Sequence, residues 1–208
     1  MILIGHYDSP YVRRVAITLR LYGLPYEHRR WSVWGDADKI ARHNPLRRAP
    51  TLVLEDGTAL VETFAIIDAL DDLVPPERAL LPRTGPVRRE GLRIAALCSG
   101  VADKAASLLY EPMFRTAPSG VWMDRCRRQI ADTLDALEKE RVARSSPFWL
   151  GLALGHPDLA FACALRFTRE AHPTLFDPAR YPALADHAAR CEEGDDFLAI
   201  YQPITNNI

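Results

Sequence analysis

The first third of the chain switches between short apolar runs and helical periodicity. Residues 2–6 form an apolar run bounded by polar residues, which predicts a buried strand. Apolar residues at helical spacing over 12–22, with Gly23 just beyond, predict a helix that stops there. A second strand over 26–31 and a short helix over 36–45 are expected next.

A hairpin and a third helix complete this pattern. Two apolar runs within 51–61 flank Asp56 and Gly57, a dipeptide that favours the tight turn of a β-hairpin. Residues 62–74 then place their apolar side chains on one helical face. The predicted order is therefore β-α-β-α-β-β-α.

A proline-rich stretch marks a domain boundary. We assign 1–76 to an α/β domain and 77–86 to a linker, since prolines at this density suit no regular element. Only helical periods follow, so 87–208 is expected to form an all-helical domain. Within it, 157–167 has few polar side chains on any face, which predicts a central, buried helix.

Composition narrows the function classes. The 208 residues are 48% hydrophobic and carry a net charge of -1, which argues against a nucleic-acid partner. The four cysteines are widely spaced, without a Cys-x-x-Cys pair, so neither a disulfide framework nor a metal site is expected. We expect no membrane segment and a cytoplasmic location, because no apolar stretch is long enough to span a bilayer.

Ser9 and Pro10 stand directly before the first helical pattern. Serine is a preferred N-cap and proline a preferred first helical residue, so helix initiation alone explains the pair. The N-terminus of a helix also offers unpaired N–H groups and a partial positive charge, which favour a bound anion. A structural role and an anion-binding role therefore both stay open for Ser9.

Four stretches of the chain together resemble one family. They are "SPYVRRV" at the first helix, "NPLRRAPTLVLEDGTALVET" over the hairpin, the proline-rich linker, and "GHPDLAFACAL" in the helical part. The arrangement is similar to that of the glutathione S-transferase superfamily, in particular its bacterial members with a catalytic serine. The resemblance covers essentially the whole chain, and the second stretch is its most specific part.

The resemblance implies a fold and an activity. A thioredoxin-like N-terminal domain would bind glutathione, and an all-α bundle would shape the site of a small electrophilic substrate. The expected protein is a cytoplasmic homodimer with a role in detoxification, in which glutathione is the co-substrate and no further cofactor or metal is used. Conjugation, peroxide reduction and isomerisation stay open as reaction subtypes.

Two other functions compete with a transferase. A non-catalytic binding protein can share the fold without turning over a substrate. A thiol-disulfide oxidoreductase is disfavoured because the predicted first domain contains no cysteine. The resemblance implies a set of glutathione-binding residues in this chain. Such a set favours the transferase, because a protein that only binds partners does not need a glutathione site.

The resemblance gives the catalytic role to Ser9. In family members with this motif, the serine hydroxyl donates a hydrogen bond to the glutathione sulfur. Tyr7 is the competing hydroxyl, because other branches of the family use a tyrosine near the end of the first strand. Arg13 is expected to be a charge on the surface of the first helix.

Five residues are implied as the glutathione-binding set: Arg48, Ala49, Pro50, Glu62 and Thr63. Pro50 would follow a cis peptide bond, and the backbone of Ala49 would pair with the cysteinyl part of the tripeptide. Arg48 would meet the glycine carboxylate, Glu62 the α-ammonium and Thr63 the γ-glutamyl carboxylate. A solvated charge at Arg48 and a helix N-cap at Thr63 are the simpler structural explanations.

The helical domain is expected to contribute the electrophile site. Tyr110 and Phe114 are candidates for its lining, together with Tyr7. Aromatic residues in such positions more often belong to a core or an interface.

Asp158 follows Gly155 by three residues, which preserves half of a helix capping box. The resemblance predicts a serine or threonine where Gly155 stands. We therefore expect Asp158 to be structural rather than catalytic.

Overall fold

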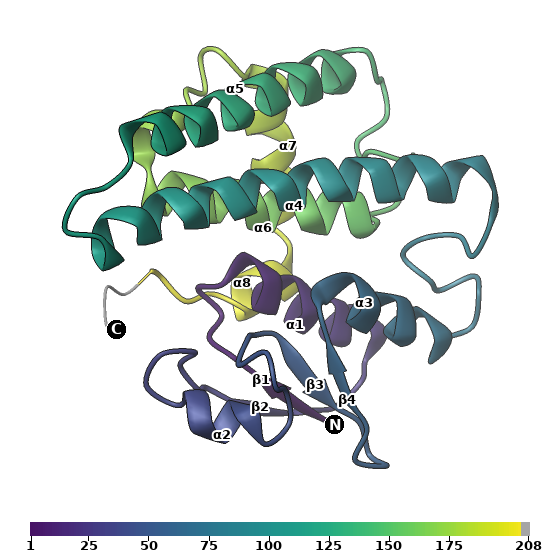
Figure 1. Cartoon of the computed structure of the whole chain (residues 1–208). Coiled ribbons are helices and arrows are strands. Elements are labelled where there is room, and N and C mark those ends of the chain that lie inside the picture. The colour runs from purple at the N-terminus through teal and green to yellow at the C-terminus, as the bar shows by residue number, and fades with distance from the viewer. Residues whose placement is uncertain (205–208) are drawn as a thin grey trace. The chain divides into compact units, whose positions relative to one another are not determined.

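The computed structural model describes residues 1–204 and divides into two compact units (Figure 1). One unit comprises Met1–Leu80 together with the segment from Gly194 onward, and the other is Leu81–Glu193. The sequence pattern predicts a helical domain over 87–208. The structure instead groups the segment from Gly194 with the first unit, and 205–208 lie outside the described residues.

The first unit has the predicted order of elements. They are β1 (Ile2–Ile4), α1 (Pro10–Tyr22), β2 (Glu27–Arg29), α2 (Ala37–Ala41), β3 (Thr51–Val53), β4 (Ala59–Val61) and α3 (Thr63–Asp72). The strands form one mixed sheet in the order β2-β1-β3-β4, with β1 parallel to β2 and every other pairing antiparallel. This is the expected thioredoxin-like arrangement.

Helix α1 begins and ends at the residues that the sequence indicates. Ser9 is its N-cap and Pro10 its first residue. Gly23 closes it in the left-handed conformation, at φ 68°, and donates its N–H to the carbonyl of Arg20 at 2.9 Å. Helix α1 packs against α3 and β1. The apolar side chains between its two ends are buried, and they are Val12, Val15, Ala16, Leu19 and Tyr22.

The segment from Gly194 joins the first unit through a short helix, α8 (Asp195–Ala199), which packs against α1. Arg13 holds it there. The guanidinium donates from Nε to the carbonyl of Ile200 at 2.8 Å and from Nη2 to that of Phe197 at 3.0 Å. Arg13 is 1% exposed, so the prediction of a surface charge was wrong.

The second unit is helical throughout, apart from one isolated bridge in its connecting loops. Its elements are α4 (Gly85–Phe114), α5 (Gly120–Val142), α6 (His156–Ala171), the 3-10 turn Pro173–Leu175 and α7 (Pro182–Glu192). Helix α6 is buried on nearly all sides, as its apolar sequence predicts.

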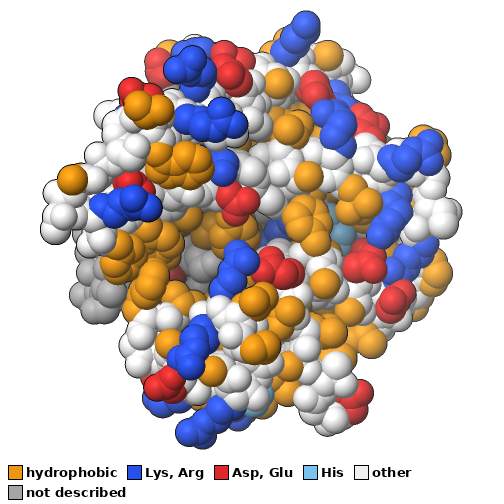
Figure 2. Space-filling model, in the orientation of Figure 1, with side chains coloured by type: hydrophobic (Ala, Val, Ile, Leu, Met, Phe, Trp, Pro, Cys, Tyr) orange, Lys and Arg blue, Asp and Glu red, His pale blue; other side chains and the backbone are white. Residues whose placement is uncertain are grey.

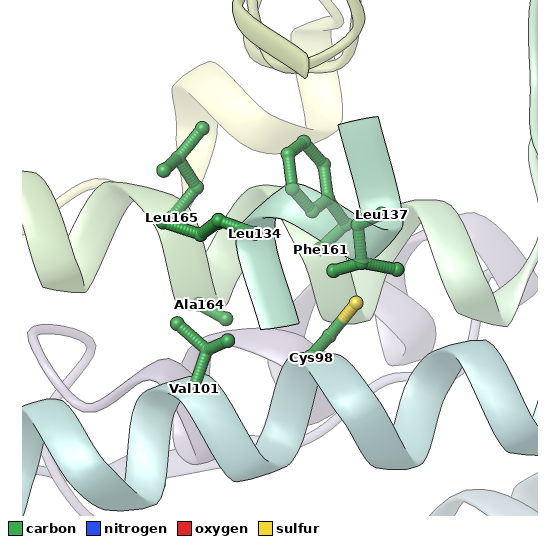
Figure 3. A pocket seen from close by; sticks show the side chains of 7 residues that line it. All are labelled: Cys98, Val101, Leu134, Leu137, Phe161, Ala164 and Leu165. Carbon is green, nitrogen blue, oxygen red and sulfur yellow. The ribbon is translucent and has the colours of Figure 1, made fainter. Parts of the chain in front are cut away.

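Apolar side chains from three helices meet at the centre of the second unit (Figure 3). Cys98 and Val101 come from α4, and α5 and α6 supply the others, namely Leu134, Leu137, Phe161, Ala164 and Leu165. All four cysteines of the chain are free and buried in this unit. They serve as small apolar core residues.

The described part of the chain carries charges of both signs on its surface. Figure 2 shows lysine and arginine interspersed with aspartate and glutamate over the face in view. Within residues 1–204, no group of three or more His, Cys, Asp and Glu side chains is placed to hold a metal ion. No described helix has the length and apolar character needed to cross a bilayer.

Asp158 organises the start of α6. Its carboxylate is fully buried and accepts the N–H of Gly155 at 2.8 Å and that of Trp149 at 2.9 Å. The Nε2 atom of His187, on α7, lies 2.9 Å from the same carboxylate. Asp158 therefore ties together a helix start, the preceding loop and a second helix, which fits the structural role expected for it.

Replacing Asp158 with alanine should lower the free energy of unfolding by about 3 kcal/mol, since two buried N–H groups lose their acceptor and the buried imidazole of His187 loses the carboxylate beside it. A cap alone would account for only about 1 kcal/mol. Urea denaturation measures the difference. Asp124→Ala is the control, because Asp124 is an exposed acid of the same unit and its loss should cost less than about 0.5 kcal/mol. Equal stability of Asp158→Ala and the control would contradict this assignment.

Candidate functional site

Strand register brings three loops to one end of the sheet. Ile4, at the end of β1, pairs with Thr51 at the start of β3, and Thr51 pairs with Val61 at the end of β4. The segments that follow β1, precede β3 and follow β4 therefore leave the sheet side by side. These segments contain most of the predicted site residues.

Gly5 is the point where the first two loops touch. Its φ is +129°, and a Cβ built there would lie 2.7 Å from the Cβ of Ala49 and 2.6 Å from Cγ2 of Val12. Only glycine fits such a close approach. The turn that leads to Ser9 is thereby packed directly against Ala49, a requirement that sequence reasoning missed.

Ser9 presents its hydroxyl at the N-terminus of α1. Its Oγ accepts the N–H of Val12 at 3.4 Å, and its own N–H donates to the carbonyl of His6 at 3.2 Å. Among residues 1–204, the Ser9 hydroxyl makes no hydrogen bond as a donor. The Ser9 oxygen therefore caps the helix as an acceptor, and the hydroxyl can still donate a hydrogen bond to another group.

Tyr7 has its hydroxyl engaged within the unit. The hydroxyl lies 2.8 Å from that of Tyr26, and the ring stacks on His28 with centroids 3.9 Å apart. Burial, followed by this hydrogen bond, raises the pKa of Tyr7 well above its usual value. Its backbone N–H donates to Oε1 of Gln202, in the segment after α8, at 3.3 Å.

The loop before β3 contains Arg48, Ala49 and Pro50. The Ala49–Pro50 peptide bond is cis, as the resemblance implies. Asn44 is buried beneath this loop and donates to the carbonyl of Arg48 at 3.0 Å. Asn44 falls at the end of the short helix predicted over 36–45, and nothing in the sequence pattern indicates that it is buried.

Glu62 and Thr63 start α3 at the exit of β4. Glu62 occupies the N-cap position with a φ of 68°, and its carbonyl accepts the N–H of Ile66 at 3.0 Å. Helix α3 includes Thr63 as its first residue, so the expectation of Thr63 as the N-cap was one position out. Thr63 is buried, whereas the Glu62 carboxylate is exposed.

Two family models match the chain. One for the glutathione S-transferase N-terminal domain covers residues 3–78, and one for the glutathione S-transferase C-terminal domain covers 120–190. The chain belongs to the glutathione S-transferase superfamily.

Individual relatives agree with this assignment. An uncharacterised GST-like protein of Escherichia coli K12, YibF, is 30% identical over 66% of this chain and 68% of its own length. Alignments with curated plant relatives cover from 37% to 80% of those proteins.

Two solved structures share the fold over nearly the whole chain. A glutathione S-transferase of Methylobacterium radiotolerans, in complex with glutathione sulfonate, is 29% identical with a TM-score of 0.88 and covers 100% of this chain and 98% of its own. A glutathione transferase family member of Pseudomonas fluorescens Pf-5, with bound glutathione, is 27% identical with a TM-score of 0.84 and covers 98% and 99%.

The predicted electrophile-site residues of this superfamily member fall in different units. Tyr110 and Phe114 lie on α4, with ring centroids 5.8 Å apart, and both are exposed. Trp122 on α5 is also exposed, with Nζ of Lys104 5.3 Å from its ring centroid. Tyr7 belongs to the first unit.

Arg48 and Glu62 form an ion pair across the two loops of the glutathione S-transferase N-terminal domain. Nη1 of Arg48 lies 2.9 Å from Oε1 of Glu62, and the side chains are 61% and 52% exposed. An ion pair this open to solvent contributes little to stability. Both groups are therefore available to a charged ligand.

Arg48→Gln and Glu62→Gln should each change the free energy of unfolding by less than about 1 kcal/mol, because water replaces the lost partner of an exposed pair. Thermal denaturation in the absence of ligand measures the change. A loss well above that value in either variant would show that the pair holds the two loops together.

Proposed function

We propose that this chain binds glutathione in its first unit and activates the thiol as a thiolate, which attacks a small electrophilic substrate. One observation carries the proposal. The Ser9 hydroxyl, with its proton available, stands at the N-terminus of α1, and the turn leading to it packs against Ala49. A glutathione whose cysteinyl backbone pairs with Ala49 would place its thiol near the Ser9 hydroxyl.

The chemistry follows from the environment of Ser9. A cysteine thiol has a pKa of about 8.5, and a helix N-terminus or a hydrogen-bond donor lowers it. The thiol proton leaves to solvent, and Ser9 Oγ–H donates to the sulfur anion. The sulfur electron pair then forms a bond to the electrophilic carbon of the substrate. With an aryl halide, the carbon–halogen bond breaks and halide departs with its electron pair.

The rest of the tripeptide is assigned to the neighbouring loops. Glutathione offers a backbone segment to Ala49, its α-ammonium to Glu62, and its γ-glutamyl carboxylate to Thr63 at the start of α3. Arg48 would take the glycine carboxylate with two donors. In this structure the Arg48 guanidinium is paired with Glu62, so it has to move away to take that role.

The surroundings of Tyr7 favour Ser9 as the catalytic hydroxyl. The Tyr7 hydroxyl is hydrogen-bonded to that of Tyr26 and its ring is stacked on His28, and its raised pKa opposes ionisation. Ser9 has no such partner for its proton within the described residues. The thiol-disulfide alternative finds no support in the described part of the first unit, because all four cysteines belong to the second.

Ser9→Ala should lower turnover of reduced glutathione with a reactive aryl halide by about ten- to a hundredfold, the effect of removing one hydrogen bond to a charged group. Tyr7→Phe should leave turnover within about threefold of wild type. The thiolate absorbance of bound glutathione at neutral pH should fall in Ser9→Ala only. Loss of that absorbance in Tyr7→Phe but not in Ser9→Ala would reverse the assignment.

Binding is tested separately from turnover. Millimolar glutathione should raise the melting temperature of wild type and of Ser9→Ala alike, because a ligand that binds the native state stabilises it. Alanine also removes a helix cap, which costs about 1 kcal/mol, so each variant is compared with its own ligand-free state. Binding without turnover of any electrophile in a panel would favour the non-catalytic alternative. Absence of any shift in wild type would overturn the proposed function.

We also propose that the protein is a cytoplasmic homodimer that detoxifies electrophiles. Exposed apolar side chains on α3, at its C-cap and on α4 support the assembly, because large exposed apolar side chains are common in protein interfaces. They are Phe64, Leu73, Val87 and Leu92. Sedimentation at micromolar concentration should give a mass of about twice 23.4 kDa. A monomer under those conditions would contradict the dimer and leave the glutathione site unaffected.

A further inference from the structure

Asn44 is a buried polar residue beneath the loop that carries Arg48 and Ala49. It is 1% exposed and lies just after α2. Its Nδ2 donates to the carbonyl of Arg48 at 3.0 Å and to Oγ1 of Thr51 at 3.0 Å. Its Oδ1 accepts the N–H of Leu46 at 2.9 Å. One side chain thus binds the loop at its start, its middle and its end.

These contacts fix which way the amide faces. Leu46 offers an N–H, which only Oδ1 can accept, and Arg48 offers a carbonyl, to which only Nδ2 can donate. Thr51 closes a triangle, because its hydroxyl accepts from Asn44 and donates to the same Arg48 carbonyl at 3.0 Å. Thr51 is fully buried and paired within the sheet, so the triangle attaches the loop to β3.

The loop needs this support because of Arg47. Its φ is 53°, in the left-handed region that side chains rarely adopt. Such a conformation persists only where the surroundings hold it on both sides. Asn44 supplies that hold. Its side chain binds Leu46 before Arg47 and Arg48 after it, and its carbonyl accepts the N–H of Arg47 at 2.9 Å.

We infer that Asn44 is a positioning residue, which holds the backbone from Leu46 to Ala49 in the conformation that receives glutathione. The inference rests on the proposed function and deepens it. Ala49 has to present its N–H and C=O to an extended tripeptide, and a loop that is already ordered loses less entropy on binding. Ser9 lies on another element, so Asn44 should govern glutathione affinity rather than the chemical step.

Asn44→Asp tests the inference with almost no change in shape. The carboxylate can still accept from Leu46, but it loses both donors and places an oxygen against the Arg48 carbonyl. We expect the KM for glutathione to rise about tenfold, while kcat at saturating glutathione stays within about twofold. Thr51→Val should raise KM in the same direction, and Thr51→Ser, which keeps the hydroxyl, should restore it.

Thr18→Val is the matched control. Thr18 is also fully buried, and its hydroxyl donates to the carbonyl of Arg14 at 2.9 Å within α1, away from the loop. The Thr18→Val substitution removes a buried hydroxyl without changing the contacts of Asn44 or Thr51. The KM of this variant for glutathione should therefore match that of wild type. A rise in KM for Thr18→Val equal to that for Thr51→Val would reduce the effect to general destabilisation and overturn the inference.

Limited trypsinolysis gives a second readout that needs no glutathione. Arg47 and Arg48 are exposed trypsin sites within the loop, and their initial cleavage, followed by mass spectrometry, should be faster in Asn44→Asp than in wild type and in Thr18→Val. Unchanged cleavage, or faster cleavage without a rise in KM, would overturn the inference while the proposed function stands. If Asn44→Asp is cleaved faster but wild type does not bind glutathione, the proposed function is overturned. The role of Asn44 in glutathione binding is overturned with it.

Discussion

Strand β3 lies between β1 and β4, and the rest of the first unit depends on that pairing. Its register aligns the end of β1, the start of β3 and the end of β4, so that the loops bearing Ser9, Ala49 and Glu62 leave the sheet together. A one-residue slip would turn every side chain of the strand to the other face. Buried Thr51 pairs with both neighbours and also bonds the loop before it, so a single residue links sheet register to loop conformation.

Much of this fold could be predicted from local patterns. The apolar face of α1, its Ser9-Pro10 start and its Gly23 end are set by side chains within a few residues of one another. The turn at Asp56 and Gly57 is equally local: the N–H of Thr58 donates to Oδ1 of Asp56 at 2.8 Å. Periodicity and turn chemistry report such features directly.

What the sequence could not indicate rests on contacts between distant residues. Arg13 looks like a surface charge because its partners, the carbonyls of Phe197 and Ile200, lie at the far end of the chain and leave no trace in its own helix. Asn44 looks like a helix end although its partners Leu46, Arg48 and Thr51 are close in sequence, because the pattern does not show that the loop folds back over it. Gly5 gives no signal either, because its requirement for glycine comes from the side chains of Val12 and Ala49.

The segment after α8 also bears on where a thiolate would find its stabilisation. Arg13 is a buried cation in the first turn of α1, yet Nε and Nη2 are bonded to two carbonyls and its guanidinium carbon lies 5.5 Å from the ring centroid of Phe197. That guanidinium is committed to holding the chain end. The Ser9 hydroxyl, whose proton no described residue accepts, is then a donor that this helix start can offer to an anion. The proposed stabilisation of the thiolate therefore depends on the Ser9 hydroxyl rather than on the basic side chain of Arg13.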